Sequence, residues 1–173
     1  MPCQHVRMAK RTGDDVDRIV AQWARERPEL DTAGMAVFGR IDRLARLVGD
    51  RQEKAYTRYG VNRGEFDVLA ALRAVGVPYQ LSAKALSASL APASGDVTGR
   101  LDRLEHAGLV VRSPDPVDRR SQVITLTLAG LQLVDDAVVA GLAAQQEAIG
   151  GLPRRSREQL TELLRELLAG AEH

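Results

Sequence analysis

The sequence of 173 residues contains a single cysteine, Cys3. One thiol cannot form an internal disulfide, which argues against a small secreted domain and fits a reducing compartment. No apolar run is expected to reach the roughly 18 residues that a membrane-spanning helix requires. The first dozen residues also lack the apolar core of a secretory signal peptide. We therefore expect a cytoplasmic protein that does not enter a membrane.

Aromatic residues are few as well: the chain has two Phe, three Tyr and one Trp. Modules that bind RNA or single-stranded DNA stack bases on several aromatic side chains, so this composition disfavours them. The formal net charge is only +1, so DNA binding must depend on where the charges are placed. Only three of the 24 basic residues are lysine, a bias towards arginine that is typical of a GC-rich genome and assigns no function by itself.

Residues that could carry out catalysis or bind a metal ion are sparse. The histidines are His5, His106 and His173, and the chain has no HExxH, cysteine pair, GxSxG or phosphate-binding loop. Such motifs place a nucleophile beside a base, or several ligands around one metal ion. We therefore predict that the protein is not an enzyme and has no catalytic residue, metal site or cofactor.

Hydrophobic periodicity and capping residues predict a mainly α-helical chain. The predicted helices run from 14 to 27, ended by Pro28; from Asp31 or Thr32 to about Tyr59; from Asn62 to about Val75; from Ser82 through Leu90; from Pro92 or Ser94 to Gly108; from Thr127 to about Ile149; and from a capping box of Ser156 and Gln159. Two runs rich in Val, Ile and Leu predict a hairpin of two strands, Leu109–Arg112 and Gln122–Leu126.

The chain length suits one domain with helical arms. We divide it into a disordered tail (1–13), an added N-terminal helix with a long core helix (14–60), a lobe that contains the hairpin (61–127), and two C-terminal helices (128–173). The last helix carries a stripe of leucines, namely Leu160, Leu163, Leu164, Leu167 and Leu168.

The predicted helix that ends at Gly108 has two distinct faces. Val97, Leu101 and Leu104 share one face, which must pack inward. The opposite face carries Gly95, Thr98, Gly99, Asp102 and Arg103. Two glycines on an exposed face lower helix stability, but they remove side-chain bulk where the floor of a DNA groove could approach. Taken alone, this face is equally typical of an ordinary solvated helix.

The turn between the two predicted strands is stiffened by Pro114 and Pro116. Asp118 can hydrogen-bond Arg120 and fix its direction, and an Arg held on a hairpin tip suits the narrow minor groove of DNA. Arg119 is better placed to meet a phosphate. The alternative is an exposed Asp–Arg pair that contributes little to stability.

The segment from Leu81 to Gly130, with its motifs RLDRLEHAGLV, PDPVDRR and ITLTLAG, resembles the winged helix-turn-helix of the MarR family of bacterial transcription regulators. The resemblance implies a DNA-binding lobe over 61–127, a two-stranded wing, and dimerisation helices at both ends of the chain. It also implies a homodimeric transcriptional repressor that binds palindromic double-stranded DNA, with Asp118 directing Arg120 into the minor groove. On this basis we assign DNA contact to Ser94, Gly95, Thr98, Gly99, Arg103, Asp118, Arg119 and Arg120.

Asp67 lies in FDVLAALRAV, a helical segment that is apolar almost all round, so we expect this carboxylate to be buried. A buried carboxylate needs a charged or hydrogen-bonding partner. Arg100 and Arg112 are the candidates. The alternative to a binding site is a buried ion pair with a purely structural role. Trp23, the single tryptophan, can likewise be an ordinary anchor of the added N-terminal helix.

Trp23, Asp67, Arg100 and Arg112 together resemble the signature of the urate-responsive branch of the family. The resemblance implies that a small anion stacks near Trp23, pairs with Arg100 and competes with Asp67. It implies that contact between Asp67 and Arg112 couples this ligand site to the DNA-binding lobe. Related regulators use the same four residues for other anions, including tricarboxylates such as citrate or aconitate. The resemblance therefore leaves the effector open among urate, another purine and a carboxylate of that kind.

Two other functions within the same fold are disfavoured. A thiol redox sensor would have to use Cys3, which has no organised base near it, whereas a reactive thiol needs a structured electropositive setting. A winged helix that makes only protein contacts would have no need for the Asp118–Arg119–Arg120 tip.

Overall fold

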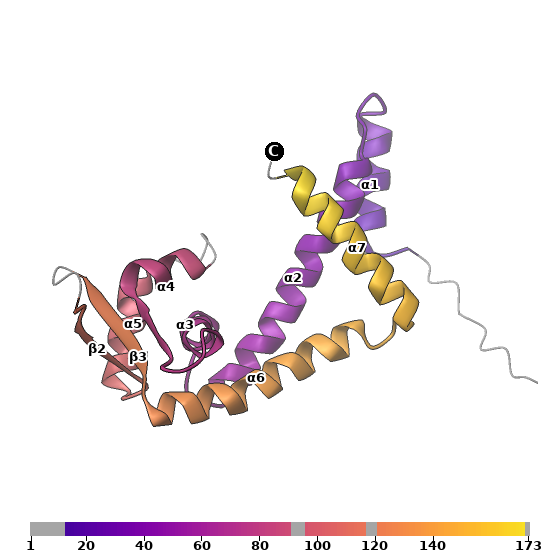
Figure 1. The fold of residues 1–173 in the computed structure, drawn as a ribbon. Helices are drawn as coiled ribbons and strands as arrows, with labels where there is room; N and C mark the ends of the chain where they lie inside the picture. The colour runs from indigo at the N-terminus through magenta and orange to yellow at the C-terminus, as the bar shows by residue number, and fades with distance from the viewer. Residues whose placement is uncertain (1–12, 91–95, 117–120, 172–173) are drawn as a thin grey trace, which may run out of the picture. The chain divides into compact units, whose positions relative to one another are not determined.

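The structure is a computed structural model that describes residues 13–90, 96–116 and 121–171 (Figure 1). The chain forms two compact units, Met1–Leu47 and Val48–His173. One long helix, α2, passes from the first unit into the second. Cys3 and nearly all of the predicted disordered tail lie outside the described residues.

The first unit contains helix α1 (Asp15–Glu26) and the beginning of α2 (Ala33–Thr57). Asp14 caps α1, because its carboxylate accepts hydrogen bonds from the backbone N–H groups of Val16 and Asp17 at 2.9 and 3.0 Å. The Asp31 carboxylate accepts from the N–H of Ala33 at 2.9 Å at the start of α2. Both predicted helices are confirmed, although α2 ends two residues before the predicted limit.

The second unit contains the end of α2 and a compact lobe of helices around a small sheet. Its further elements are α3 (Arg63–Ala74), β1 (Gln80–Ser82), α4 (Ala83–Ser89), α5 (Val97–His106), β2 (Val110–Pro114), β3 (Gln122–Leu126), α6 (Leu128–Ile149) and α7 (Arg154–Ala171). The predicted caps at Asn62, Ser82 and Thr127 are confirmed. So is the left-handed glycine after α5, since Gly108 has φ +71°.

The sheet has three antiparallel strands in the order β1-β3-β2, not the two strands expected. The hairpin of β2 and β3 was predicted correctly, with Arg112 opposite Ile124. Strand β1 was missed because its three residues are too few to show an alternating pattern. It pairs Leu81 with the same Ile124, so that this fully buried residue lies at the centre of the sheet.

The core of the second unit joins α3 to the sheet and to its neighbouring helices. Helix α3 packs against α4, α5, α6 and β3. The largest fully buried side chains come from all of these elements, namely Val68, Leu69, Leu72, Leu86, Leu104, Val110, Ile124 and Val134. This core fixes the positions of α3 and α5 relative to each other, and therefore the positions of the charged side chains that these two helices carry.

Two helices begin at residues other than those predicted. Helix α5 begins at Val97 with Asp96 as its N-cap, later than the expected start at Pro92 or Ser94. Helix α7 begins at Arg154, so Ser156 lies inside the helix and the predicted capping box is wrong. The N–H of Ser156 bonds to the carbonyl of Pro153 at 3.0 Å, as expected within a first helical turn.

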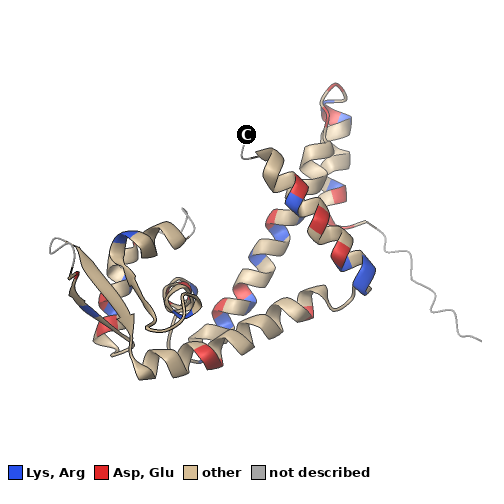
Figure 2. Cartoon of the chain, in the orientation of Figure 1, with Lys and Arg blue, Asp and Glu red and all other residues tan. Residues whose placement is uncertain are grey.

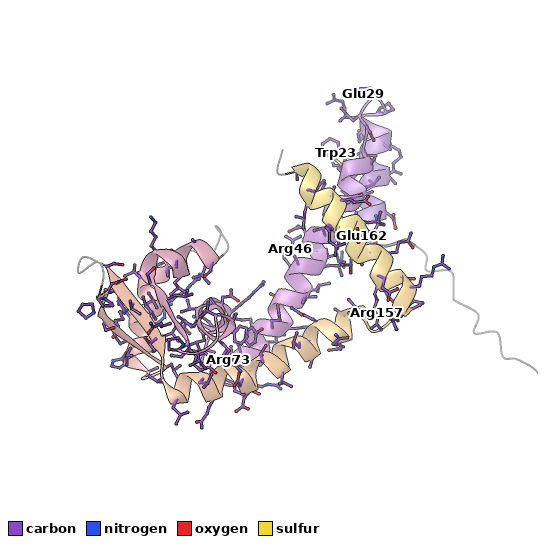
Figure 3. All side chains as sticks on the ribbon, in the orientation of Figure 1. Trp23, Glu29, Arg46, Arg73, Arg157 and Glu162 are labelled. Carbon is purple, nitrogen blue, oxygen red and sulfur yellow. The ribbon has the colours of Figure 1, made fainter. Side chains whose placement is uncertain are left out.

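Helix α6 is the exception to the expected absence of long apolar segments. It is long and apolar enough to cross a membrane, with a mean hydropathy of 1.2 over 18 residues. A helix of a folded core meets the same criteria, so this is weak evidence of membrane insertion. In this structure α6 packs on α3, buries Val134 and Ala137, and pairs Asp135 with Arg73 at 2.7 Å. Figure 2 shows its few charged residues, and Figure 3 labels Arg73.

Candidate functional site

Helix α5 has the two faces that its sequence predicts. Leu101 and Leu104 are buried, with exposed fractions of 6% and 1%. Thr98 and Arg103 lie on the exposed face. The helix is therefore oriented with a polar face available to a partner.

Gly99 has a structural role that the sequence did not reveal. Asp96 caps α5, and its Oδ1 accepts a hydrogen bond from the Gly99 N–H at 2.9 Å. A Cβ added at position 99 would lie 2.1 Å from Oδ2 of Asp96. The absence of a side chain at 99 thus lets the capping carboxylate lie against the first turn. Asp96 could have been found from its spacing of three residues from Gly99.

Arg103 is joined to the start of α3. Its Nε donates to Oε1 of Glu65 at 2.5 Å. Glu65 is 7% exposed, and its Oε2 accepts from the backbone N–H of Asn62 at 2.9 Å. Burial acts to raise the pKa of Glu65, but the hydrogen bonds from Arg103 and Asn62 outweigh it and keep the pKa below its ordinary value. The sequence predicted the start of α3 at Asn62 but not the link from Glu65 to Arg103.

Arg112 does not pair with Asp67 as predicted. It lies on β2 with 14% of its side chain exposed, and its guanidinium forms ion pairs with Asp102 and Glu105 of α5. Its backbone N–H donates to Oε1 of Glu105 at 3.1 Å. These bonds connect the first strand of the hairpin to α5. Asp102 and Glu105 are three residues apart, so they lie on one face of the helix and can both pair with Arg112.

The described part of the hairpin ends short of its tip. The N–H of Asp115 bonds to the carbonyl of Ser121 at 3.0 Å. The predicted contact residues of the tip, Asp118, Arg119 and Arg120, lie outside the described residues, as do Ser94 and Gly95 before α5.

Asp67 borders a cavity of about 240 Å³ within the second unit. Its lining comes from α2, α3 and α6 and consists of Gln52, Tyr56, Arg63, Phe66, Asp67, Val138, Gly141, Leu142 and Gln145. Burial raises the pKa of Asp67, and the charges of Arg63 and Arg100 only partly oppose this. Tyr56 and Phe66 stack with ring centroids 3.9 Å apart. The cavity therefore combines a half-buried carboxylate with a cation, Arg63, beside two aromatic side chains that stack on each other.

Arg100 lies between α5 and α3, close enough for its charge to act on Asp67. Its guanidinium rests on Gly64, where an added Cβ would come within 2.5 Å of Cζ. Its Nη1 is buried and has no hydrogen-bond partner among the described residues. A buried donor without a partner is unfavourable and can be satisfied by an incoming acceptor.

Trp23 belongs to the first unit, on α1 (Figure 3). It is 42% exposed and lines a groove of about 410 Å³ between α1 and α2, together with Ile19 and Met35. Asp67 and Arg100 belong to the second unit. A joint site that includes Trp23 therefore stays a prediction.

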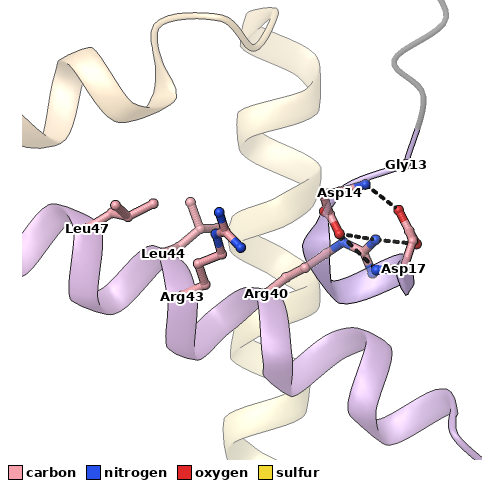
Figure 4. Close-up of a pocket in the computed structure, with 7 residues that line it drawn as sticks. All are labelled: Gly13, Asp14, Asp17, Arg40, Arg43, Leu44 and Leu47. Atoms are coloured by element: carbon pink, nitrogen blue, oxygen red, sulfur yellow. Dashed lines mark hydrogen bonds and ion pairs between the residues drawn. The ribbon is translucent and has the colours of Figure 1, made fainter. Parts of the chain in front are cut away.

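A second hollow in the first unit lies where α1 is attached to α2 (Figure 4). It measures about 620 Å³, and Arg40 projects into it from α2. The Arg40 guanidinium bonds to Asp14 at 3.0 Å and to Asp17 at 2.5 Å. The hydrogen bond from Arg40 lowers the pKa of Asp17. Arg40 of α2 is thus paired with two carboxylates at the start of α1. We interpret these ion pairs as the attachment of α1 to α2. Among the described residues, no three His, Cys, Asp or Glu side chains form a group that could hold a metal ion.

Comparison with known proteins identifies the lobe that contains α3, α5 and the hairpin. Residues 59–121 match the family model described as MarR family. The transcriptional regulator PecS of Dickeya dadantii is 35% identical over 150 residues, which cover 87% of this chain and 90% of PecS.

Solved structures share the fold. Sco3205, a MarR family transcriptional regulator from Streptomyces coelicolor solved in complex with DNA, has a TM-score of 0.71 at 22% identity, covering 82% of this chain and 89% of that one. BpsR of Bordetella bronchiseptica, whose DNA binding is regulated by 6-hydroxynicotinic acid, has a TM-score of 0.59 at 29% identity, covering 74% of this chain and 98% of its own.

Proposed function

Because the chain belongs to the MarR family of transcriptional regulators, which are not enzymes, we propose that it is a homodimeric repressor whose binding to a palindromic duplex is relieved by a small anion. The observation that carries this proposal is the setting of α5. Its exposed face is held on one side by Glu65 of α3 and on the other by Arg112 of the hairpin. A helix held in this way can enter a major groove in one defined orientation.

The proposed DNA contacts are those expected from the sequence. Thr98, Gly99 and Arg103 would meet the major groove, together with Ser94 and Gly95 before the helix. Arg120, directed by Asp118, would enter the minor groove, and Arg119 would contact phosphate. The complex of Sco3205 with DNA supports DNA as the partner of this fold.

Exposed apolar residues on the C-terminal helices support a homodimer. No residue in the described part of α7 is buried, although the helix carries the predicted leucine stripe. Leu163 and Leu168 are 54% and 64% exposed, and Val139 of α6 is 66% exposed. Apolar surface of this extent on two helices is typical of a protein interface. A two-fold axis through such an interface would place the two α5 helices about one DNA turn apart.

The proposed effector is a planar anion that binds near Asp67 and Arg100. The unsatisfied Nη1 of Arg100 offers it a donor, and Tyr56 and Phe66 line the cavity beside Asp67. Regulation of BpsR by 6-hydroxynicotinic acid supports an aromatic anion of this size, as urate or another purine would be. An anion beside ionised Asp67 is unfavourable until one of them moves, and this links occupancy to a conformational change.

Two alternatives remain distinct from this proposal. The four residues Trp23, Asp67, Arg100 and Arg112 also resemble those of regulators that respond to citrate or aconitate. A tricarboxylate is therefore the second class of effector. A redox response would require Cys3, which lies outside the described residues.

Titration of a labelled duplex from the intergenic region upstream of the gene, measured by fluorescence anisotropy, tests the proposal. We expect selective binding over a scrambled duplex in low salt, and release by urate, xanthine or 6-hydroxynicotinate but not by citrate. Arg100→Ala and Trp23→Ala should raise the anion concentration needed for release. Absence of selective binding would contradict the regulator, and release by citrate alone would contradict the aromatic effector.

A further inference from the structure

Glu65 is the charged residue that the described part of the chain buries most completely. Only Gln52 and Glu65 are buried polar residues among those described. Placing a carboxylate out of water is costly unless both oxygens are satisfied. Here Oε2 accepts from the Asn62 N–H and Oε1 accepts from Arg103 Nε, so one side chain bonds to the start of α3 and to α5.

The bond to Glu65 uses only part of the Arg103 guanidinium. The side chain remains 58% exposed, and its terminal nitrogens make no hydrogen bond to a described residue. A Cβ at position 99 would lie 3.5 Å from Nη1 of Arg103, so the guanidinium extends back along α5 to its first turn. Helical side chains lean towards the N-terminus in this way. The first turn of a recognition helix is also where base edges are contacted.

We propose that Glu65 is a positioning residue for DNA recognition, which holds Arg103 by its Nε and thereby presents the two Nη nitrogens to the duplex. This inference rests on the proposed function and deepens it. A free arginine side chain samples many rotamers, and a fixed one loses less entropy when it binds. The charge of Glu65 is offset by the guanidinium that it positions.

The geometry predicts a specific coupling between the two side chains. Glu65→Gln keeps the shape but removes the charge that holds Nε. We expect it to weaken operator binding about tenfold, which is the usual scale for a lost charge-assisted contact. Arg103→Ala should weaken binding by at least as much. In the Arg103→Ala background, Glu65→Gln should have almost no further effect, because there is no guanidinium left to position.

A matched control separates this role from capping of α3. Glu53 Oε2 accepts from the Arg63 N–H at 2.8 Å, so Glu53 also bonds to the first turn of α3, but none of its bonds reaches α5. Glu53→Gln should leave operator affinity and the Arg103 coupling unchanged. Melting temperatures of all variants show whether a loss of binding follows a loss of folding.

Arg103→Lys supplies a second readout that leaves the Asn62–Glu65 cap intact. Lysine keeps the positive charge but cannot present two directed nitrogens while bonded to Glu65. We expect binding to a scrambled duplex to persist and selectivity for the operator to fall.

Additive losses in the double variant, or undiminished selectivity in Arg103→Lys, would overturn the role of Glu65. Failure of the wild-type protein to bind any duplex would instead overturn the proposed function, so the two outcomes are distinguishable.

Discussion

Arg100 lies across Gly64 so closely that a Cβ at position 64 would come within 2.5 Å of the guanidinium carbon. This contact joins α5 to the first turn of α3, one residue before Glu65, which pairs with Arg103. The same turn therefore contacts α5 through two arginines. A displacement of Arg100 by a ligand would act at the turn that also holds Arg103.

Substitution of Gly64 by alanine should displace Arg100 without unfolding the protein. The displaced atoms belong to the end of a flexible side chain, and alanine favours a helix over glycine by up to ~1 kcal/mol, so we expect the melting temperature to change little. Anion affinity should fall, because the displaced guanidinium of Arg100 no longer acts on Asp67 from the same position. Isothermal titration with urate or 6-hydroxynicotinate measures the effect. Gly34→Ala, where nothing lies within 4 Å of the added Cβ, is the control, and equal affinities in the two variants would contradict the placement of the site.

Asp67→Asn should increase anion affinity and alter the pH dependence of stability. Burial raises the pKa of Asp67 above 3.8, so the folded state binds more protons than the unfolded chain just above that pH. The free energy of unfolding that Asp67 contributes must therefore decrease as pH rises through this window. Urea denaturation at a series of pH values should show this decrease in the wild type and not in Asp67→Asn. A wild-type contribution that increases with pH would contradict the burial of this carboxylate.

Attachment of α1 should weaken in acid. The hydrogen bond from Arg40 lowers the pKa of Asp17 below 3.8, so the stabilisation is present above that value and is lost as pH falls through the lower, folded-state pKa. Arg40→Gln should produce the same loss at neutral pH. Trp23 lies on α1, so its fluorescence reports the change as a shift of the emission to longer wavelength. Arg18→Gln is the control, since Arg18 pairs with Asp15 inside α1 and does not reach α2. A shift of equal size in both variants would show that Arg40 does not attach the helix.

Most of the helices could be predicted because their limits depend on local chemistry. Asn62, Ser82 and Thr127 each cap the helix that follows. Each side-chain oxygen accepts from the N–H three residues later, and residues of this kind before an apolar-periodic segment can be recognised in the sequence. Ser156 failed as a cap because a proline-started turn already begins α7 at Arg154. Strand β1 depends on its pairing with β3, which no local pattern encodes.

The candidate site was less predictable because it depends on which charged residues meet across elements. The sequence supplied Asp67, Arg100 and Arg112 but not their partners. Each arginine had several carboxylates of similar character within reach, and only the packing of α3, α5 and β2 selects among them. Arg112 thus pairs with Asp102 and Glu105, and Arg103 takes the buried Glu65.

Arg112→Gln distinguishes the observed pairing of Arg112 with α5 from the pairing with Asp67 that the resemblance implies. If Arg112 coupled to Asp67, the substitution would blunt the response to the anion. In the structure it connects β2 to α5 through Asp102 and Glu105, so its loss should release the hairpin from α5. We expect a loss of stability of about 1–2 kcal/mol, as for a partly buried charged hydrogen bond, and a fall in operator affinity. Anion affinity of the DNA-free protein should be unchanged. Calorimetry and duplex titration on the same preparation measure the two affinities, and Arg18→Gln again serves as an exposed-pair control. A variant with normal operator affinity and weakened anion binding would restore Asp67 as the partner of Arg112.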